Sequence, residues 1–298
     1  RLMLNNKSLF QFGPLDQGYW PDGLYTPPTD EAMRSDIEFL KEAGFNMLRK
    51  HVKVEPARFY YYCDLLGMIV WQDMPNGGIT PNASWFVFQN SSSRRRDDRF
   101  YCRRGRRSPG NRQQFESELK EMVDALKNAV SIAVWVPFNE GWGQFDANRI
   151  HRWLKDHDPS RIIDQASGWF DQESGDVKSH HIYFKNFAMV PNDMQRATVL
   201  SEYCGYQMLV KGHFWVDRQV SVYKGFNDPL KLGQAYEQLS LNQLLPWVKR
   251  GLSAAIYTQT TDVEVEINGF LTYDREVIKI PAEVLTKMNL ELINSSPK

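Results

Sequence analysis

The chain has 298 residues and carries no net charge, because 36 Lys and Arg side chains balance 36 Asp and Glu side chains. A neutral chain of this length fits one large domain and excludes a global electrostatic attraction to nucleic acid or to an anionic membrane surface. No apolar run approaches the roughly 18 residues that would span a bilayer, so we expect a soluble protein, cytoplasmic or periplasmic if it is bacterial. Its oligomeric state stays open.

Eight short apolar segments predict strands, at Leu9 to Gly13, Phe45 to Arg49, Met68 to Gln72, Ile132 to Phe138, Arg161 to Ala166, His180 to Phe184, Ala197 to Glu202 and Ser253 to Thr258. Most of them lack polar alternation, which is typical of parallel strands covered on both faces. Between them, amphipathic patterns predict helices at Asp30 to Ala43, Pro56 to Leu66, Arg112 to Leu126, Phe145 to Asp156 and Gly233 to Lys249. An alternation of strand and helix repeated about eight times predicts an α/β fold, a (β/α)8 TIM barrel. A doubly wound open sheet is the alternative, although no glycine-rich phosphate turn follows any strand.

Two stretches interrupt this pattern. Residues 91–110 contain eight arginines between Arg94 and Arg107, and we expect a solvated or disordered insertion after the third strand, with polyanion binding as the alternative. The stretch from Tyr203 to Lys231 is rich in aromatic residues and glycine and follows the seventh strand. Long loops of this kind often line a site.

Polar residues cluster where the predicted strands end. In a parallel barrel these ends share one mouth, where the reactive groups of such enzymes lie. The candidates in chain order are Asp16, Arg49, His51, Gln72, Asp73, Asn139, Glu140, Ser167, Trp169, His181, Tyr183, Glu202, Gln259 and Asp262.

Glu140 and Glu202 each end an apolar strand. A carboxylate buried beside apolar residues is costly unless it is hydrogen-bonded or used, and the same burial raises its pKa toward that of a general acid. Two carboxylates about 5 Å apart suit the cleavage of a glycosidic bond with retention of configuration. Asn139 could hold a sugar hydroxyl, and Trp142 could stack on a pyranose. The alternative is that each glutamate only pairs with an arginine or caps a helix.

The run "FNEGWG" and the run "VLSEYCGY" resemble the acid/base and nucleophile strands of retaining glycosidases with (β/α)8 barrels. The runs "LDQGYWPDG", "FNMLRKH", "MIVWQDMP" and "NGFLTYDR" are similar, more narrowly, to the catalytic domain of glycoside hydrolase family 2, which includes β-galactosidases, β-glucuronidases and β-mannosidases. The resemblance covers nearly the whole chain apart from the Arg-rich insertion and the last dozen residues. It implies a single TIM-barrel catalytic domain over residues 1–298, without the N-terminal β-sandwich domains of the family.

The resemblance also implies roles for individual residues. Glu140 would be the general acid/base and Glu202 the nucleophile, while Asn139 would bind the sugar 2-hydroxyl. Arg49 would keep Glu202 ionised, a role that charge pairing supports independently. The predicted substrate-binding residues are Asn139, Arg49, His51, Asp16, Asp73, Trp142, Trp169, His181, Tyr183 and Gln259. Many family members carry a Trp on the eighth strand, where this chain has Tyr257, Thr258 and Gln259.

The function that this resemblance implies is an exo-acting retaining β-glycosidase with a carbohydrate substrate and no cofactor or metal. β-Galactosides are the favoured substrates because they are the commonest in the family, and β-glucuronides, β-glucosides and β-mannosides remain alternatives. From another class, a barrel that has lost catalysis would be a carbohydrate-binding protein. A metal-dependent barrel hydrolase would need several His and Asp ligands at strand ends, and the first predicted strand has no histidine.

Overall fold

The structure is a computed structural model that describes residues 1–77, 96–183, 186–187, 195–216 and 223–297. Eight parallel strands form one sheet in the order β7-β6-β5-β4-β3-β12-β9-β8. They are β3 (Gln11–Asp16), β4 (Met47–Lys50), β5 (Ile69–Asp73), β6 (Ile132–Val136), β7 (Ile162–Ile163), β8 (Val177–Ile182), β9 (Ala197–Tyr203) and β12 (Ala254–Tyr257). A hydrogen bond of 3.0 Å from the Asp176 N–H to the Ile163 carbonyl connects the two outer strands, so the sheet is nearly closed. The predicted TIM barrel is confirmed.

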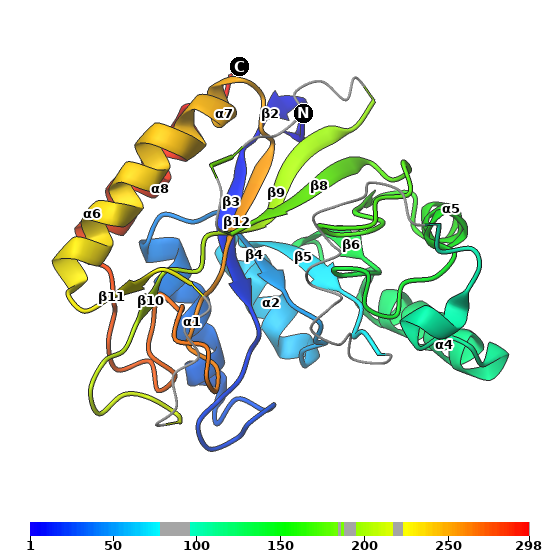
Figure 1. Ribbon diagram of the computed structural model, residues 1–298, viewed down its shortest axis with the longest axis horizontal. Helices are drawn as coiled ribbons and strands as arrows, with labels where there is room; N and C mark the ends of the chain where they lie inside the picture. The colour runs from blue at the N-terminus through cyan, green and yellow to red at the C-terminus, as the bar shows by residue number, and fades with distance from the viewer. Residues whose placement is uncertain (78–95, 184–185, 188–194, 217–222, 298) are drawn as a thin grey trace.

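Helices surround the sheet (Figure 1). They are α1 (Asp30–Glu42), α2 (Ala57–Leu66), α4 (Pro109–Leu126), α5 (Ala147–His157), α6 (Pro229–Leu239), α7 (Leu245–Lys249) and α8 (Ala282–Asn294), with a 3-10 turn η1 (Tyr101–Arg104) and a π turn η2 (Ser240–Leu244). Two short pairs lie outside the barrel, β1 (Met3–Leu4) with β2 (Lys7–Ser8) and β10 (Gln207–Met208) with β11 (Gly225–Phe226). No helix among the described residues has the length and apolar character that crossing a membrane requires.

Two parts of the fold differ from the sequence prediction. No helix follows β7, because residues 164–176 cross to β8 as an irregular segment that side chains hold in place. Arg196 forms a two-bond ion pair with Asp171 at 2.8 and 2.9 Å, and Lys155 pairs with Asp176 at 2.8 Å. The sequence analysis also did not identify α8, a helix that buries Leu285, Met288, Asn289 and Leu292.

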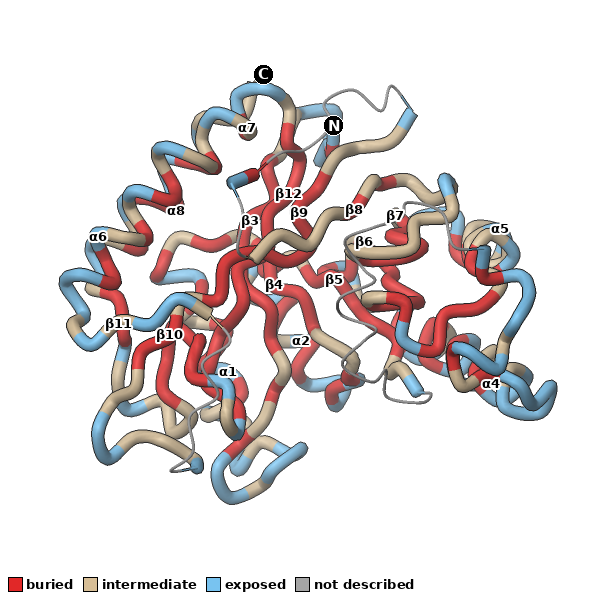
Figure 2. Tube along the Cα trace, in the orientation of Figure 1, coloured by how far each residue is buried: buried red, intermediate tan, exposed pale blue. Residues whose placement is uncertain are grey.

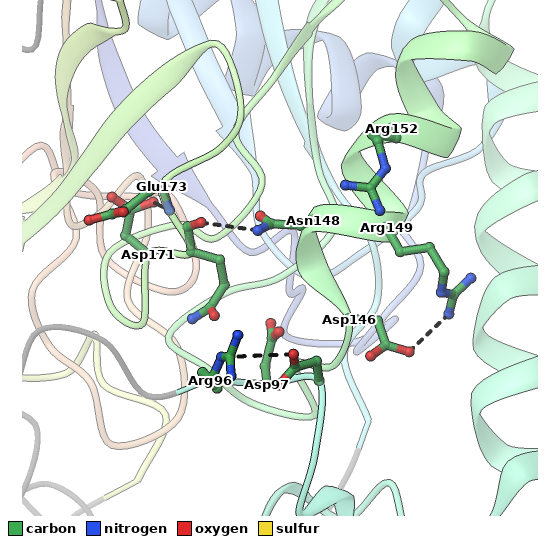
Figure 3. Close-up of a pocket in the computed structure, with 10 residues that line it drawn as sticks. Arg96, Asp97, Asp146, Asn148, Arg149, Arg152, Asp171 and Glu173 are labelled. Carbon is green, nitrogen blue, oxygen red and sulfur yellow. Dashed lines mark hydrogen bonds and ion pairs between the residues drawn. The ribbon is translucent and has the colours of Figure 1, made fainter.

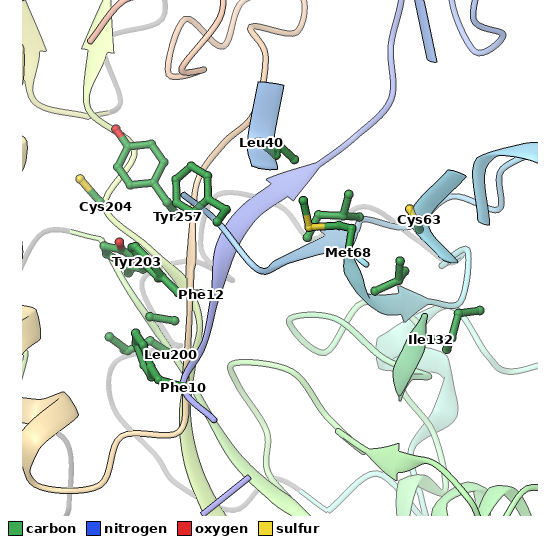
Figure 4. Packing of buried hydrophobic residues seen from close by; sticks show 14 of the residues in the cluster. Phe10, Phe12, Leu40, Cys63, Met68, Ile132, Leu200, Tyr203, Cys204 and Tyr257 are labelled. Carbon is green, nitrogen blue, oxygen red and sulfur yellow. The ribbon is translucent and has the colours of Figure 1, made fainter. Parts of the chain in front are cut away.

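The apolar core has two layers. Figure 2 shows that buried residues run along the strands. The outer layer lies between the sheet and the helices, and Figure 4 shows part of it, including Phe12, Leu40, Met68 and Tyr257. The inner layer fills the barrel and contains Leu15, Met47, Trp71, Val134, Val136, Val177, Val199, Ala254 and Ile256. Successive residues of a strand face opposite sides. On β4, Met47 belongs to the inner layer and Leu48 to the outer one, so the next residue, Arg49, points into the barrel.

The described part of the Arg-rich stretch, residues 96–110, is folded through η1 and the start of α4, and most of its residues are exposed, as a solvated stretch would be. Residues 91–95, with Arg94, lie outside the described residues. Arg104 and Arg106 are buried. Arg104 donates to the Gly141 carbonyl at 3.2 Å, and Arg106 donates to the Gly143 carbonyl at 2.9 Å. These arginines therefore support the turn that follows β6.

Candidate active site

Glu140 lies in a tight turn four residues beyond β6. Asn139 forms a bridge with Ser167, and the Glu140 N–H donates to the Ser167 carbonyl at 3.0 Å. Glu140 has a φ of 52°, in the left-handed region that non-glycine residues seldom adopt. The next residue, Gly141, also has a positive φ of 72°, and a Cβ there would meet the Phe170 ring at 2.2 Å. Left-handed backbone at a non-glycine residue is found preferentially at functional sites.

Glu202 reaches the same mouth through an irregularity in β9. Its neighbour β8 pairs His180 with Leu200 and then His181 with Glu202, which leaves Ser201 as an extra residue. An extra residue of this kind bends a strand and changes the direction of the following side chain. Glu202 is buried, with 4% of its surface exposed.

The two glutamates meet across the mouth of the barrel. One oxygen of each carboxylate and one ring nitrogen of His181 all lie within 4.8 Å of one another. His181 Nδ1 lies 2.8 Å from Glu140 Oε1. The Tyr183 hydroxyl donates to Glu202 Oε2 and lies 3.2 Å from Glu140 Oε1. The strand-end rule therefore brings Glu140, His181, Tyr183 and Glu202 together, as the sequence predicted.

Arg49 joins the nucleophile candidate to the floor of the site. Its side chain is fully buried and donates five hydrogen bonds. Two go to the Asp73 carboxylate, both at 2.9 Å, and one goes to Glu202 Oε1 at 3.1 Å. The other two go to the Ser201 carbonyl at 3.0 Å and to Asn139 Oδ1 at 2.8 Å. The Asn139 amide oxygen is thus held, which leaves its NH2 group to donate elsewhere.

The two glutamates have different electrostatic surroundings. Burial raises the pKa of Glu140 to about 7, although His51, Tyr183 and Arg49 act in the opposite direction. Burial lowers the pKa of His181 to about 4, so its ring is neutral near pH 7. Glu202 instead pairs directly with the guanidinium of Arg49. A carboxyl group that is protonated near neutrality beside one that pairs with a fixed cation is the arrangement of an acid and a nucleophile.

His51 and Asp73 lie beside this group. His51 Nδ1 is 3.0 Å from Asp73 Oδ2, and this contact raises the pKa of His51 against the effect of burial. Burial would raise the pKa of Asp73, but Arg49 and His51 together hold it below its usual range. Asp73 therefore orients the Arg49 guanidinium and the His51 ring near the glutamates.

The remaining predicted site residues are Asp16, Trp142, Trp169 and Gln259. Asp16 is buried and accepts from Lys50 at 2.7 Å and from the Gly18 N–H at 3.0 Å, so its carboxylate is already paired. The Trp169 ring contacts the His181 ring edge-on at 5.7 Å, whereas Trp142 is 36% exposed. Gln259 is fully buried at the end of β12.

Two residues near the pair were not predicted individually. The Tyr223 ring lies 5.7 Å from the Tyr183 ring, and it belongs to the aromatic stretch that the sequence assigned to the site. Glu266 follows β12 and interacts electrostatically with Glu202 and Glu140. No strand precedes Glu266 directly, so the strand-end rule cannot identify it.

Two other features could hold a ligand. Within the described part of the chain, Glu140, His181 and Glu202 form the only group of His, Cys, Asp or Glu side chains close enough to share a metal ion. These are the same residues to which the sequence analysis assigned the glycosidase site. A separate open cavity of about 530 Å³ lies between residues 96–98, the start of α5 and residues 171–173 (Figure 3). Its lining is mostly charged, with Asn148 and Gln172 as the uncharged residues, and it includes neither glutamate of the pair.

A parallel barrel with two acids facing each other at its carboxyl edge has the architecture of a retaining glycoside hydrolase. Residues 27–225 match the family model described as "Glycosyl hydrolases family 2, TIM barrel domain". The chain belongs to this family.

Relatives in sequence and in structure agree with that membership. The chain is 28% identical over 180 residues to "Beta-galactosidase 2" of Enterobacter cloacae and 26% identical over 185 residues to a β-galactosidase of Erwinia tasmaniensis. Each match covers 59% of this chain but only 15% of the relative, so the chain spans a small part of the length of these proteins. A β-galacturonidase of Eisenbergiella tayi superposes with a TM-score of 0.69 at 18% identity, covering 96% of this chain and 52% of that one. A β-glucuronidase of Bacteroides uniformis superposes with a TM-score of 0.64 at 20% identity, covering 97% and 36%.

Proposed function

We propose that this chain is the catalytic barrel of a retaining exo-β-glycosidase, with β-galactosides as its substrates. The observation that carries the proposal is the carboxylate pair, whose oxygens come within 4.8 Å of each other. Retaining enzymes hold their two carboxyl groups about 5 to 5.5 Å apart, whereas inverting enzymes need about 6.5 to 9.5 Å to admit a water. The choice of galactoside follows the names of the curated relatives.

In the first step, Glu202 attacks the anomeric carbon while Glu140 protonates the leaving oxygen. Arg49 holds Glu202 in place through its 3.1 Å contact, and the Tyr183 hydroxyl donates to the other oxygen of Glu202. Glu140 can supply the proton because its pKa of about 7 keeps it largely protonated below neutrality.

In the second step, Glu140 returns as a base and activates the water that releases the sugar from Glu202. Neutral His181 supports both forms of Glu140, because one ring nitrogen can donate to the carboxylate or accept from the carboxylic acid. Its other nitrogen lies 3.1 Å from the Ser167 hydroxyl, which can reverse its own role to match. The Asn139 NH2 group would donate to the sugar 2-hydroxyl.

The decisive experiment traps the covalent intermediate. A dinitrophenyl 2-deoxy-2-fluoro-β-galactoside should add one sugar to the protein, and mass spectrometry of peptides should locate it on Glu202. Glu202→Gln should abolish both labelling and hydrolysis, while Glu121→Gln on the exposed face of α4 should change neither. Labelling on another residue, or inversion of the first-formed sugar anomer by NMR, would refute the mechanism.

A second experiment assigns the acid. Glu140→Gln should lose about 10² to 10⁴ in kcat on galactosides with poor leaving groups. It should lose much less on dinitrophenyl galactoside, which departs with little protonation. Hydrolysis of nitrophenyl β-galactoside should be compared with that of the β-glucoside, β-glucuronide and β-mannoside. Equal losses of Glu140→Gln on good and poor leaving groups would contradict its assignment as the acid.

A further inference from the structure

The turn that carries Glu140 has an unfavourable backbone conformation. Glu140 and Gly141 have φ values of 52° and 72°, both in the left-handed region. A non-glycine residue stays in this region only where its surroundings hold it there. The hydrogen bond of 3.0 Å from the Glu140 N–H to the Ser167 carbonyl is one such support. That bond holds only the amide on the N-terminal side of Glu140.

Arg104 holds the C-terminal side of the same turn. Its buried side chain donates from Nη1 to the Gly141 carbonyl at 3.2 Å. The guanidinium also lies over the Phe170 ring, 4.6 Å from the ring centre. Gly141 lies between these two groups, because a Cβ on it would come within 2.2 Å of Phe170 and 3.0 Å of Arg104 Nη1. The backbone next to Glu140 is therefore clamped from two sides.

Arg104 is in turn fixed by the stretch to which it belongs. It is the last residue of η1. Earlier in the same stretch, the Asp97 carboxylate accepts from Gln144 Nε2 at 2.8 Å and from the Ala147 N–H at 3.1 Å. Gln144 and Ala147 follow the Glu140 turn directly along the chain. The described part of the Arg-rich stretch is thus attached to this turn at several points.

These contacts act on one glutamate of the pair and not on the other. Glu202 is held instead by Arg49 and by the Tyr183 hydroxyl, which belong to β4 and to the segment after β8. Loss of the clamp would therefore displace Glu140 and leave Glu202 in place. A general acid must lie within hydrogen-bond distance of the leaving oxygen, and a displacement of about 1 Å can cost about 10² in rate.

We propose that Arg104 is a positioning residue for Glu140, and that it holds the turn in the conformation from which Glu140 donates a proton and later accepts one. This inference rests on the proposed function and adds to it a task for the Arg-rich stretch. Because Arg104 acts through the backbone of Gly141, its loss should impair proton transfer and spare the attack by Glu202. An arginine that only stabilised the fold would affect both alike.

The test varies the leaving group of the substrate. Phenyl β-galactoside needs its leaving oxygen protonated, whereas the dinitrophenyl group departs with little protonation. Arg104→Met should lower kcat/KM for phenyl galactoside by about tenfold to 100-fold and kcat/KM for dinitrophenyl galactoside by less than about threefold. Arg103→Met is the matched control, because Arg103 is the exposed neighbour of Arg104 in η1. It should change neither value.

Azide provides a second readout, because it attacks the anomeric carbon of the glycosyl-enzyme without help from a base. The bond from that carbon to Glu202 then breaks, Glu202 leaves as a carboxylate, and the product is β-galactosyl azide. With dinitrophenyl galactoside, azide should raise the kcat of Arg104→Met and yield this product. The native chain and Arg103→Met should not be accelerated, because Glu140 still activates water in both.

Arg104→Lys is a second variant that keeps the charge and a donor for the Gly141 carbonyl but lacks the flat face that contacts Phe170. It should show the same pattern with a smaller loss on phenyl galactoside. It carries the test if urea unfolding shows that Arg104→Met does not fold. Equal losses on the two substrates, no loss on either, or no response to azide in the variant that carries the test would overturn the inference. The same pattern in Arg103→Met would also overturn it.

The proposed function and this inference fail in different ways. If the native chain is active and Glu140→Gln shows the leaving-group pattern while the Arg104 variant does not, only this inference is overturned. A native preference for another β-glycoside moves the same comparison to the phenyl and dinitrophenyl glycosides of that sugar. If the native chain hydrolyses no glycoside, the proposed function is refuted and the inference falls with it.

Discussion

The stability of Glu140→Gln, measured relative to that of the native chain, should rise with pH. The Glu140 side chain is 14% exposed, and burial raises its pKa from 4.5 to about 7. In the unfolded chain the carboxyl group ionises near 4.5, while in the folded chain it stays protonated until about pH 7. A raised pKa of this kind contributes stability fully below pH 4.5, and that contribution is lost as the pH rises through 7. Glutamine has no such dependence.

The size of the effect follows from the shift in pKa. A difference of about 2.5 units at roughly 1.4 kcal/mol per unit gives about 3.5 kcal/mol across the whole range. Between pH 5 and pH 8, the free energy of unfolding of Glu140→Gln should therefore gain roughly 2 to 3 kcal/mol relative to that of the native chain. For a protein of this size, that corresponds to a relative change in Tm of roughly 5 °C or more.

The assay is a series of urea and thermal unfolding curves at pH 5, 6, 7 and 8 for the native chain, Glu140→Gln and the exposed control Glu121→Gln. The native kcat/KM for nitrophenyl galactoside should also fall above about pH 7, where Glu140 loses its proton. A stability difference between the native chain and Glu140→Gln that does not vary with pH would refute the reasoning from burial. The unfolding curves test this reasoning whether or not the protein hydrolyses a glycoside.

Three further predictions concern the groups around the pair. Arg49→Lys should lower the free energy of unfolding, measured in urea, by about 3 kcal/mol or more. Lys has three donors for the five acceptors that Arg49 contacts, and hydrogen bonds to charged groups contribute about 1.5 to 3 kcal/mol each. A loss below about 1 kcal/mol would contradict this prediction. Tyr183→Phe should move the alkaline limb of kcat/KM to higher pH, because the Tyr183 hydrogen bond lowers the pKa of Glu140, and an unmoved limb would count against that contact. Arg106→Met should destabilise the fold by about 2 kcal/mol by leaving the Gly143 carbonyl without its donor, while Arg107→Met at an exposed site should not; equal effects in urea would indicate that the stretch is only a solvated surface.

The eight strands could be predicted from the sequence because each is a short apolar run that the barrel covers on both faces. The ends of the strands were harder to predict than the strands themselves. The first strand continues through Pro14 to Asp16, several residues beyond the predicted end at Gly13. The irregular segment after β7 depends on long-range ion pairs such as Arg196 with Asp171, which no local pattern reveals.

The candidate site could be predicted from the rule that functional groups lie at the carboxyl ends of parallel strands. That rule brought together Glu140, His181, Tyr183 and Glu202. The rule could not show that the Asp16 carboxylate pairs with Lys50, because that ion pair depends on the positions of neighbouring strands. A composition argument also treated the arginines of residues 91–110 alike, whereas burial separates Arg106 from its exposed neighbours.

The register of two strands explains why two glutamates at equivalent strand ends would have different roles. Alternation along β4 points Arg49 into the barrel, and the extra residue Ser201 in β9 directs Glu202 toward it. The hydrogen-bonding neighbours of Glu140 are instead a neutral imidazole and a phenol hydroxyl. Removing the extra residue would return Glu202 to the opposite face of β9. Arg49 would then lose one of its two carboxylate partners, and the difference in charge state that the proposed mechanism requires would be lost with it.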